Sequence, residues 1–199
     1  MSYGVDLKSA LRIFYYLIYV DGIINDDEIV EFDDIVLNSV NTSDVDKIRQ
    51  STVDYCIKRI GDISDKQRLY DFVYGEVNNE LNIYGRHVSW DHNMCKAGDT
   101  IVSPQWFIWN LLTLAVSDNE YLDNENRIID MAVKKVGLDE DIYMQFDMLI
   151  RTAKDVFKEL EWIKESDKSY NEIDIIVKEL ENKISIINKQ SRILIEEED

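Results

Sequence analysis

Two acidic turns hold the side chains of this 199-residue chain that are best suited to chemistry. The first runs from Asp21 to Glu28 and the second from Asp118 to Glu125, and each follows a strongly apolar segment. Carboxylate oxygens are the ligands that Ca²⁺ and Mg²⁺ prefer in proteins. If the two turns lie together, Asp21, Glu28, Asp118 and Glu125 form a candidate metal site.

Helix capping is one alternative role for the same residues, and a protein-recognition surface is another. Asn25 suits the N-cap of the helix after the first turn, and Glu28 follows at the capping-box position. Acidic residues in a first helical turn are also favoured by the helix dipole. In the second turn Leu122 occupies the position of the capping residue, so we expect Asp123 to cap instead and the turn to be one residue longer. Neither turn has the ligand pattern or the glycine of an EF-hand.

A second group of possible metal ligands lies in the aperiodic segment 85–103. His87, Asp91, His92 and Cys95 have the ligand types that zinc accepts. Their spacing matches no closed structural zinc pattern, and a fourth ligand is not evident. The alternative is a long loop whose polar residues have no ligand role.

Helices must position these turns. Apolar residues around Tyr15 and Trp109 recur on nearly every side of a helix, which predicts two buried central helices. Asp6 is the expected cap of the first, and Ser103 with Pro104 is the expected start of the second. An amphipathic helix follows each turn. The expected inward face of the first of these comprises Ile29, Val30, Phe32, Ile35, Val36 and Val40.

Two further amphipathic helices lie between Thr42 and Tyr84, and Ser64 is the expected cap of the second. After Asp139 the apolar spacing becomes heptad-like over two segments separated by a polar break. Such paired seams predict an antiparallel helical hairpin. The seams either pack within the chain or join a second copy or a partner helix. The four acidic residues that end the sequence should fray the last turn.

Composition limits the function classes. A net charge of −18 disfavours direct nucleic-acid binding, because no basic stripe offsets it. No signal peptide is evident and the longest apolar run is too short to span a bilayer, so we expect a cytoplasmic protein without a transmembrane segment. No catalytic triad, Walker loop or dinucleotide fingerprint is present. These features favour a protein that is not an enzyme, with a metal-dependent hydrolase as the alternative.

The segment from Val20 to Glu28 resembles the signature of TerB-like domains, which occur in tellurite-resistance systems and at the N-terminus of some DnaJ co-chaperones. The second turn resembles the second motif of that family, although Asn119 replaces its glycine. The resemblance covers roughly residues 5 to 140. It implies an all-helical bundle of two pseudo-symmetric hairpins, and we place this domain at 1–138 and the C-terminal hairpin at 139–199.

The resemblance implies a bacterial stress-response or phage-defence role, a divalent-cation site in the acidic turns, and assembly with membrane-associated or nucleotide-linked partners. We therefore expect an acidic binding module, with Ca²⁺ or Mg²⁺ as the candidate cation. From the charge alone, an alternative is an acidic decoy or immunity protein that masks a basic nucleic-acid-binding partner. Clustering of carboxylates at the two turns would favour the binding module. Rows of carboxylates along one long face of the protein would favour the decoy. The hairpin offers a route to a homodimer.

Overall fold

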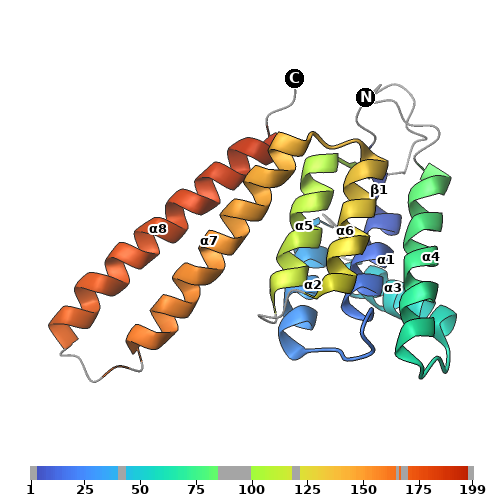
Figure 1. Ribbon diagram of the computed structural model, residues 1–199, viewed down its shortest axis with the longest axis horizontal. Coiled ribbons are helices and arrows are strands. Elements are labelled where there is room, and N and C mark those ends of the chain that lie inside the picture. Colours follow the sequence, from blue (N-terminus) through green and yellow to red (C-terminus); the bar gives the residue numbers. More distant parts are fainter. Residues whose placement is uncertain are drawn as a thin grey trace. The chain divides into compact units, whose positions relative to one another are not determined.

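The computed structural model describes residues 4–39, 44–84, 100–117, 122–164, 166 and 170–196. Over these residues the chain is all-α, as the sequence predicts, with one pair of two-residue strands (Figure 1). It divides into two compact units, Met1–Asp139 and Glu140–Asp199. Unit 1 comprises β1 (Val5–Asp6), α1 (Leu7–Ile18), α2 (Asp26–Ser39), α3 (Val45–Ile60), α4 (Lys66–Tyr84), β2 (Ile101–Val102), α5 (Pro104–Ser117) and α6 (Asp123–Val136). Unit 2 comprises α7 (Glu140–Lys164) and α8 (Tyr170–Glu196).

Helix α1 is the centre of unit 1, because it contacts α2, α3, α4 and α5. Its start is fixed by Asp6, whose carboxylate accepts the backbone N–H of Ser9 at 3.1 Å, as expected for an N-cap. Most of the helix is buried, which confirms the prediction from its all-round apolar pattern. The buried residues are Ser9, Ala10, Leu11, Ile13, Phe14, Tyr15, Tyr16, Leu17 and Ile18.

Helix α5 is the second central element and contacts α1, α2 and α6. It begins at Pro104, and the Oγ of Ser103 accepts the N–H of Trp106 at 3.1 Å, so the predicted start is confirmed. Phe107 of α5 stacks on Phe14 of α1 with ring centroids 5.6 Å apart. Both rings are fully buried.

The two strands join the starting ends of the two central helices. β1 pairs antiparallel with β2, with Val5 opposite Val102, and each strand leads directly into a central helix. In Figure 1 the α1–α2 connection lies at the same lower end of unit 1 as the C-terminus of α5 and the N-terminus of α6. The fold therefore places the N-termini of α2 and α6 at one end of the unit.

Two local predictions in unit 1 are wrong. Asp65, not Ser64, caps α4, because the Asp65 carboxylate accepts the N–H of Arg68 at 2.9 Å. Val30 is 61% exposed, so it does not belong to the inward face of α2. The buried residues there are Glu28, Phe32, Ile35 and Val36, and Val30 lies on the opposite side of the helix. Val40 lies outside the described residues.

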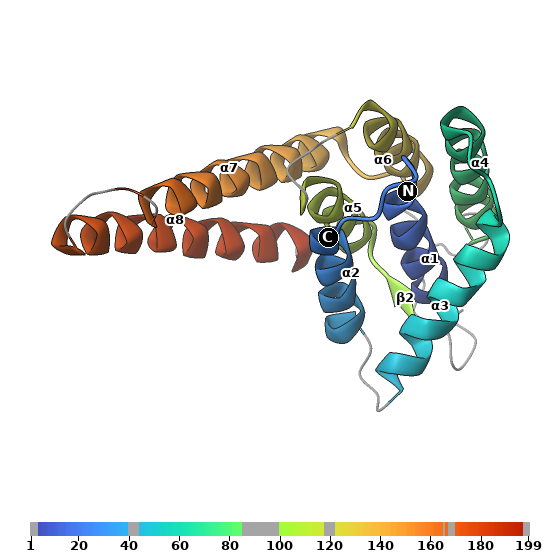
Figure 2. The same ribbon diagram turned by 90° about the horizontal axis from the view of Figure 1, so that it is seen from below.

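Unit 2 is a hairpin of two long helices that run side by side in Figures 1 and 2. Apolar residues of both heptad seams are buried or half-buried, including Phe146, Val156 and Ile163 on α7 and Leu180 and Ile187 on α8. Because α7 and α8 are extensively in contact, the seams are used within the hairpin.

Gly22, in the first acidic turn, has a backbone φ of 81°, which side chains disfavour. A Cβ there would lie 3.2 Å from the Cδ2 of Leu69 on α4. We expect Gly22→Ala to lower the free energy of unfolding by about 1–2 kcal/mol. Gly75→Ala is the matched control, because Gly75 is helical and a Cβ there meets nothing within 4 Å.

Gly75→Ala should stabilise the protein by up to about 1 kcal/mol, since alanine is the better helix former. Urea denaturation of both variants measures the difference. Equal effects of the two substitutions would show that Gly22 has no special conformational role.

Candidate functional site

The first acidic turn is built from side-chain-to-backbone hydrogen bonds. The Oδ1 of Asp21 accepts the N–H of Ile23 at 2.8 Å, and the Oε2 of Glu28 accepts the N–H of Asn25 at 3.0 Å. Glu28 is buried, with 5% of its surface exposed. The predicted capping-box contact of Glu28 is therefore present.

The second acidic turn repeats this arrangement at its helix start. The Oε2 of Glu125 accepts the N–H of Leu122 at 2.8 Å, and Glu125 is 3% exposed. Helix α6 begins at Asp123, so Leu122 occupies the N-cap position although its side chain accepts no hydrogen bond. The expectation that Asp123 caps and lengthens the turn is wrong, because the contact to Glu125 fixes the N-cap one residue earlier.

The structure describes three of the four candidate metal ligands of the acidic turns. Asp21, Glu28 and Glu125 are described, whereas Asp118 lies outside the described residues. No group of three or more His, Cys, Asp or Glu side chains suited to a metal occurs in the described ranges. Calcium takes six to eight oxygen ligands. The described residues alone therefore do not make a complete Ca²⁺ or Mg²⁺ site, and cation binding there stays a prediction. The alternative zinc ligands His87, Asp91, His92 and Cys95 also lie outside the described residues.

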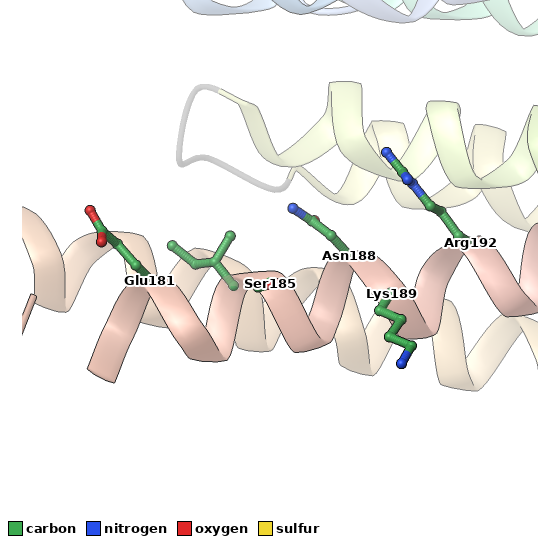
Figure 3. A pocket seen from close by; sticks show the side chains of 6 residues that line it. Glu181, Ser185, Asn188, Lys189 and Arg192 are labelled. Carbon is green, nitrogen blue, oxygen red and sulfur yellow. The ribbon is translucent and has the colours of Figure 1, made fainter. Parts of the chain in front are cut away.

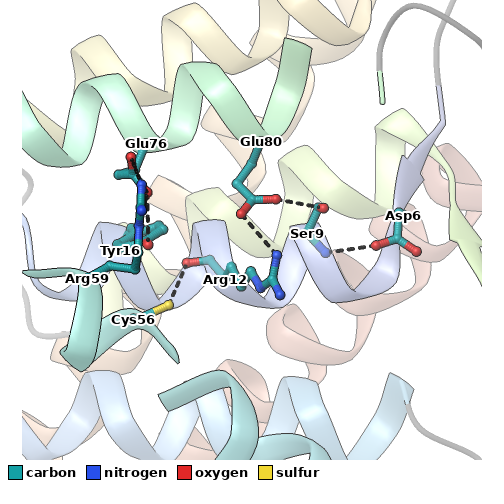
Figure 4. A network of polar contacts seen from close by, with 8 residues as sticks. All are labelled: Asp6, Ser9, Arg12, Tyr16, Cys56, Arg59, Glu76 and Glu80. Atoms are coloured by element: carbon teal, nitrogen blue, oxygen red, sulfur yellow. Dashed lines mark hydrogen bonds and ion pairs between the residues drawn. The ribbon is translucent and has the colours of Figure 1, made fainter. Parts of the chain in front are cut away.

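A buried polar network, which the sequence did not reveal, links α1, α3 and α4 (Figure 4). Glu80 of α4 accepts hydrogen bonds from the Oγ of Ser9 at 2.9 Å and from the Nη1 of Arg12 at 3.1 Å. The Arg12 guanidinium also lies 3.8 Å from the ring centre of Tyr55 on α3. Its Nε is buried without a hydrogen-bond partner among the described residues, and the Tyr55 ring supplies the compensating cation–π contact.

The other half of the network is centred on Glu76, one turn before Glu80. Arg59 of α3 donates to both carboxylate oxygens of Glu76, with contacts between 2.6 and 2.9 Å. The hydroxyl of Tyr16 donates to the same carboxylate at 3.4 Å. Burial, with Cys56 and Glu76 nearby, raises the pKa of Tyr16, so this hydroxyl remains a donor. The network holds three helices together and has no exposed nucleophile.

Cys56 is fully buried beside this network, with its Sγ 3.8 Å from the backbone oxygen of Arg12. Burial is the main cause that raises its pKa to about 12. A thiol with that pKa is almost wholly protonated at neutral pH and is a poor nucleophile. Cys56 therefore acts as a small packed side chain in this unit.

Helix α2 carries the most one-sided charge in the described part of unit 1. Its fourteen residues include six carboxylates and no Lys or Arg: Asp26, Asp27, Glu28, Glu31, Asp33 and Asp34. The guanidinium of Arg49 on α3 forms a bidentate ion pair with the carboxylate of Asp33. Asp26, Asp27 and Asp34 are exposed, so α2 presents a negative surface that begins within the first acidic turn.

Partial burial raises the pKa of Glu31 above its ordinary value of 4.5; the Thr113 hydroxyl opposes this shift and Asp34 adds to it. A raised folded-state pKa means that the ionised carboxylate costs stability at neutral pH. We expect Glu31→Gln to raise the melting temperature at pH 7. The gain should shrink as pH falls through the folded-state pKa and be gone below 4.5, where the folded and unfolded carboxyls are both protonated. Thermal melts of both proteins across this pH range give the comparison, and a gain independent of pH would contradict the charge-burial explanation.

A hollow of ≈ 440 Å³ lies along α8 (Figure 3) and is lined by Glu181, Ile184, Ser185, Asn188, Lys189 and Arg192. All six lining residues belong to one helix, and five of them are exposed. A small-molecule site normally has converging polar groups from several elements. This hollow is therefore part of the open surface of α8 and lacks the features of a small-molecule site.

None of the described helices has the length and apolar content that a bilayer crossing requires. The sequence matches no protein-family model. It also matches no curated protein and no solved structure. The resemblance to TerB-like domains therefore stays a prediction from the two acidic turns.

Proposed function

We propose that this chain is an acidic protein-interaction module that binds a basic partner through one surface of unit 1. This surface, the α2 end of unit 1, comprises α2 and the turn before it, residues 21–39. The supporting observation is the charge of α2, which has six carboxylates and no cation of its own. Three of these carboxylates, on Asp26, Asp27 and Asp34, are exposed. Opposite charge across an interface speeds association and excludes like-charged partners. In the TerB-like interpretation, the module acts in a cytoplasmic bacterial stress-response or phage-defence complex.

The decoy alternative requires acidic rows along one long face. The hairpin contains the two longest helices that the structure describes, yet α7 mixes six carboxylates with four cations and α8 mixes five with four. Several of these charges pair along the helix, as in Arg151 with Asp147 and Lys178 with Asp174. The concentration of unbalanced carboxylates on α2 favours the module over the decoy.

Matched charge variants of the full chain test this proposal. One variant combines Asp26→Asn, Asp27→Asn and Asp34→Asn on α2. The control combines Glu159→Gln, Glu161→Gln and Glu179→Gln on the exposed surface of the hairpin. Both variants lose three negative charges, so the net charge is the same. A fluorescent oligolysine peptide is the probe, and its binding is measured by anisotropy at low and high salt.

The α2 variant should bind the peptide more weakly and with a smaller salt dependence than the control. Equal weakening in both variants would mean that only the net charge matters, and the proposed surface would be wrong. Thermal melts of both variants confirm that they are folded. This check matters because Asp26 and Asp27 also interact with the helix dipole, at about 0.3–1 kcal/mol each.

Divalent-cation binding at the acidic turns is a further part of the proposal. A cation that binds only the folded state must raise the melting temperature. We expect Ca²⁺ or Mg²⁺ to stabilise the wild type and to have no effect on Asp21→Asn/Asp118→Asn. Melts with and without each cation measure this effect. The same shift in wild type and variant would remove the turns as the site.

Homodimer formation through the hairpin also stays a proposal. Because the seams are buried between α7 and α8, a dimer would have to use their outer faces, where Ile175, Ile186 and Ile193 are exposed. Sedimentation equilibrium of the full chain, over a range of concentrations, measures the mass directly. A single monomer mass throughout would exclude the dimer.

A further inference from the structure

The outward face of α2 combines its charge with apolar side chains. Val30 and Leu37 are each 61% exposed, more than the other exposed apolar residues of unit 1 that the structure describes. They are seven residues apart, which is two helical turns, so both lie on the same line along the helix. This line is opposite the buried residues Phe32, Ile35 and Val36.

Carboxylates lie on both sides of this apolar line. At 100° per residue, Asp26 and Asp33 lie to one side of Val30, and Asp27 and Asp34 lie to the other. Asp33 is paired with Arg49. Among the described residues, Asp26, Asp27 and Asp34 form no ion pair within 4.0 Å. The face therefore has an apolar centre and two negative margins.

The turn before α2 extends the exposed apolar surface. Ile23 is 53% exposed and Ile24 is 39% exposed. Single exposed apolar residues are normal on protein surfaces. Here, however, two lie in heptad register on one helix and two more lie in the turn that leads into it. A helix with apolar residues at a seven-residue spacing is what another amphipathic helix recognises.

We propose that the outward face of α2 is a docking surface for an amphipathic, basic helix of a protein partner. The apolar residues of that helix would contact Val30 and Leu37, and its Lys or Arg residues would flank them and face Asp26, Asp27 and Asp34. The proposal rests on the proposed function and adds the shape and chemistry of the partner.

Charge complementarity selects this partner class. A nucleic-acid backbone or an anionic membrane surface would be repelled by the carboxylate margins. An acidic or neutral helix would satisfy the apolar line but leave the carboxylates without counter-charges. A flexible cationic chain would satisfy the charges but leave Val30 and Leu37 exposed. Only a helix with both features satisfies the whole face.

Two synthetic peptides of identical composition test the proposal with the full chain. The first has leucines at a and d positions of successive heptads with lysines at the flanking positions, and the second has the same residues in an order that spreads the leucines around the helix. The protein variants are Val30→Ala and Leu37→Ala, with Ile57→Ala as control. Ile57 is 50% exposed on α3, which makes it a comparable apolar residue outside the face.

The amphipathic peptide should bind more tightly than the scrambled one. Val30→Ala and Leu37→Ala should each weaken its binding by about threefold to tenfold, because each removes part of an apolar contact that becomes buried when the peptide binds. Ile57→Ala should change binding less than twofold. Alanine favours the helix, and these side chains are exposed, so the melting temperatures should stay close to that of the wild type.

The possible results separate this inference from the proposed function. If the charge variants of α2 weaken binding but Val30→Ala and Leu37→Ala do not, the surface is purely electrostatic and the helix-docking inference is wrong. Equal affinity for the two peptides would overturn it in the same way. If neither peptide binds at all, both the inference and the proposed function fail.

Discussion

Replacing Glu80 by Ala should lower the free energy of unfolding by about 3–5 kcal/mol, because it removes one partner of a buried ion pair. The side chain of Glu80 is 7% exposed and that of Arg12 is 17% exposed. Without the carboxylate, the Arg12 guanidinium and the buried Ser9 hydroxyl both lose their acceptor. Urea denaturation followed by circular dichroism measures the loss.

A surface ion pair provides the control for Glu80. Arg151 and Asp147 pair on α7 with their side chains 55% and 32% exposed, so Asp147→Ala should cost less than about 1 kcal/mol. The triple variant Ser9→Ala/Arg12→Met/Glu80→Leu should recover most of the stability lost in Glu80→Ala, since it leaves no unpaired polar group. Similar small losses for Glu80→Ala and Asp147→Ala would show that the network contributes little to holding α1 against α4.

Phe107→Ala is the second variant with a large expected effect, at about 3–5 kcal/mol. Phe107 is fully buried and its ring stacks on that of Phe14, at the contact between the two central helices. Truncation should leave a cavity between α1 and α5. Phe157→Ala is the control, because Phe157 is 50% exposed on α7 and its loss should cost about 0.5 kcal/mol or less.

The same denaturation experiment compares Phe107→Ala with its control. A small cost for Phe107→Ala would mean that the helices can close the cavity without loss of packing, and α1 and α5 would then not form a tightly packed centre.

Local features of the fold were predictable because their determinants are close in sequence. Asp6, Ser103 and Glu28 each bind a backbone N–H three residues away, so spacing alone identifies them. The exceptions are also local. Ser64 and Asp65 are both good caps, and the sequence does not choose between neighbours. Leu122 is the N-cap residue of α6 although its side chain accepts no hydrogen bond. The carboxylate of Glu125 accepts the backbone N–H of Leu122 and fixes the helix start.

Long-range features were not predictable from periodicity. Val5 pairs with Val102, and two residues are too short a strand to leave an alternating pattern. Glu76 and Glu80 occur one turn apart beside the apolar residues Val73 and Val77, which was the available signal for a buried network. Their partners Arg59 and Arg12 are on other helices, and only the rotation of those helices in the fold brings them together.

The candidate functional surface was also predictable only in part. Val30 fits the apolar spacing of α2, so the sequence placed it inward, whereas the fold leaves it exposed between carboxylates. The packing of α2 on α1 and α5 determines which of its apolar residues face the core. The acidic side chains of α2 were evident from the sequence, but their combination with an exposed apolar line was not.

Backbone amide shift mapping tests the central claim, that the α2 end of unit 1 is the binding surface, most directly. The ¹⁵N-labelled full chain would be titrated with the unlabelled amphipathic basic peptide. We predict that the largest shifts occur at Ile23–Asn25 and along α2, centred on Val30 and Leu37. Shifts confined to α7 and α8, or spread evenly over the acidic surface, would contradict the claim.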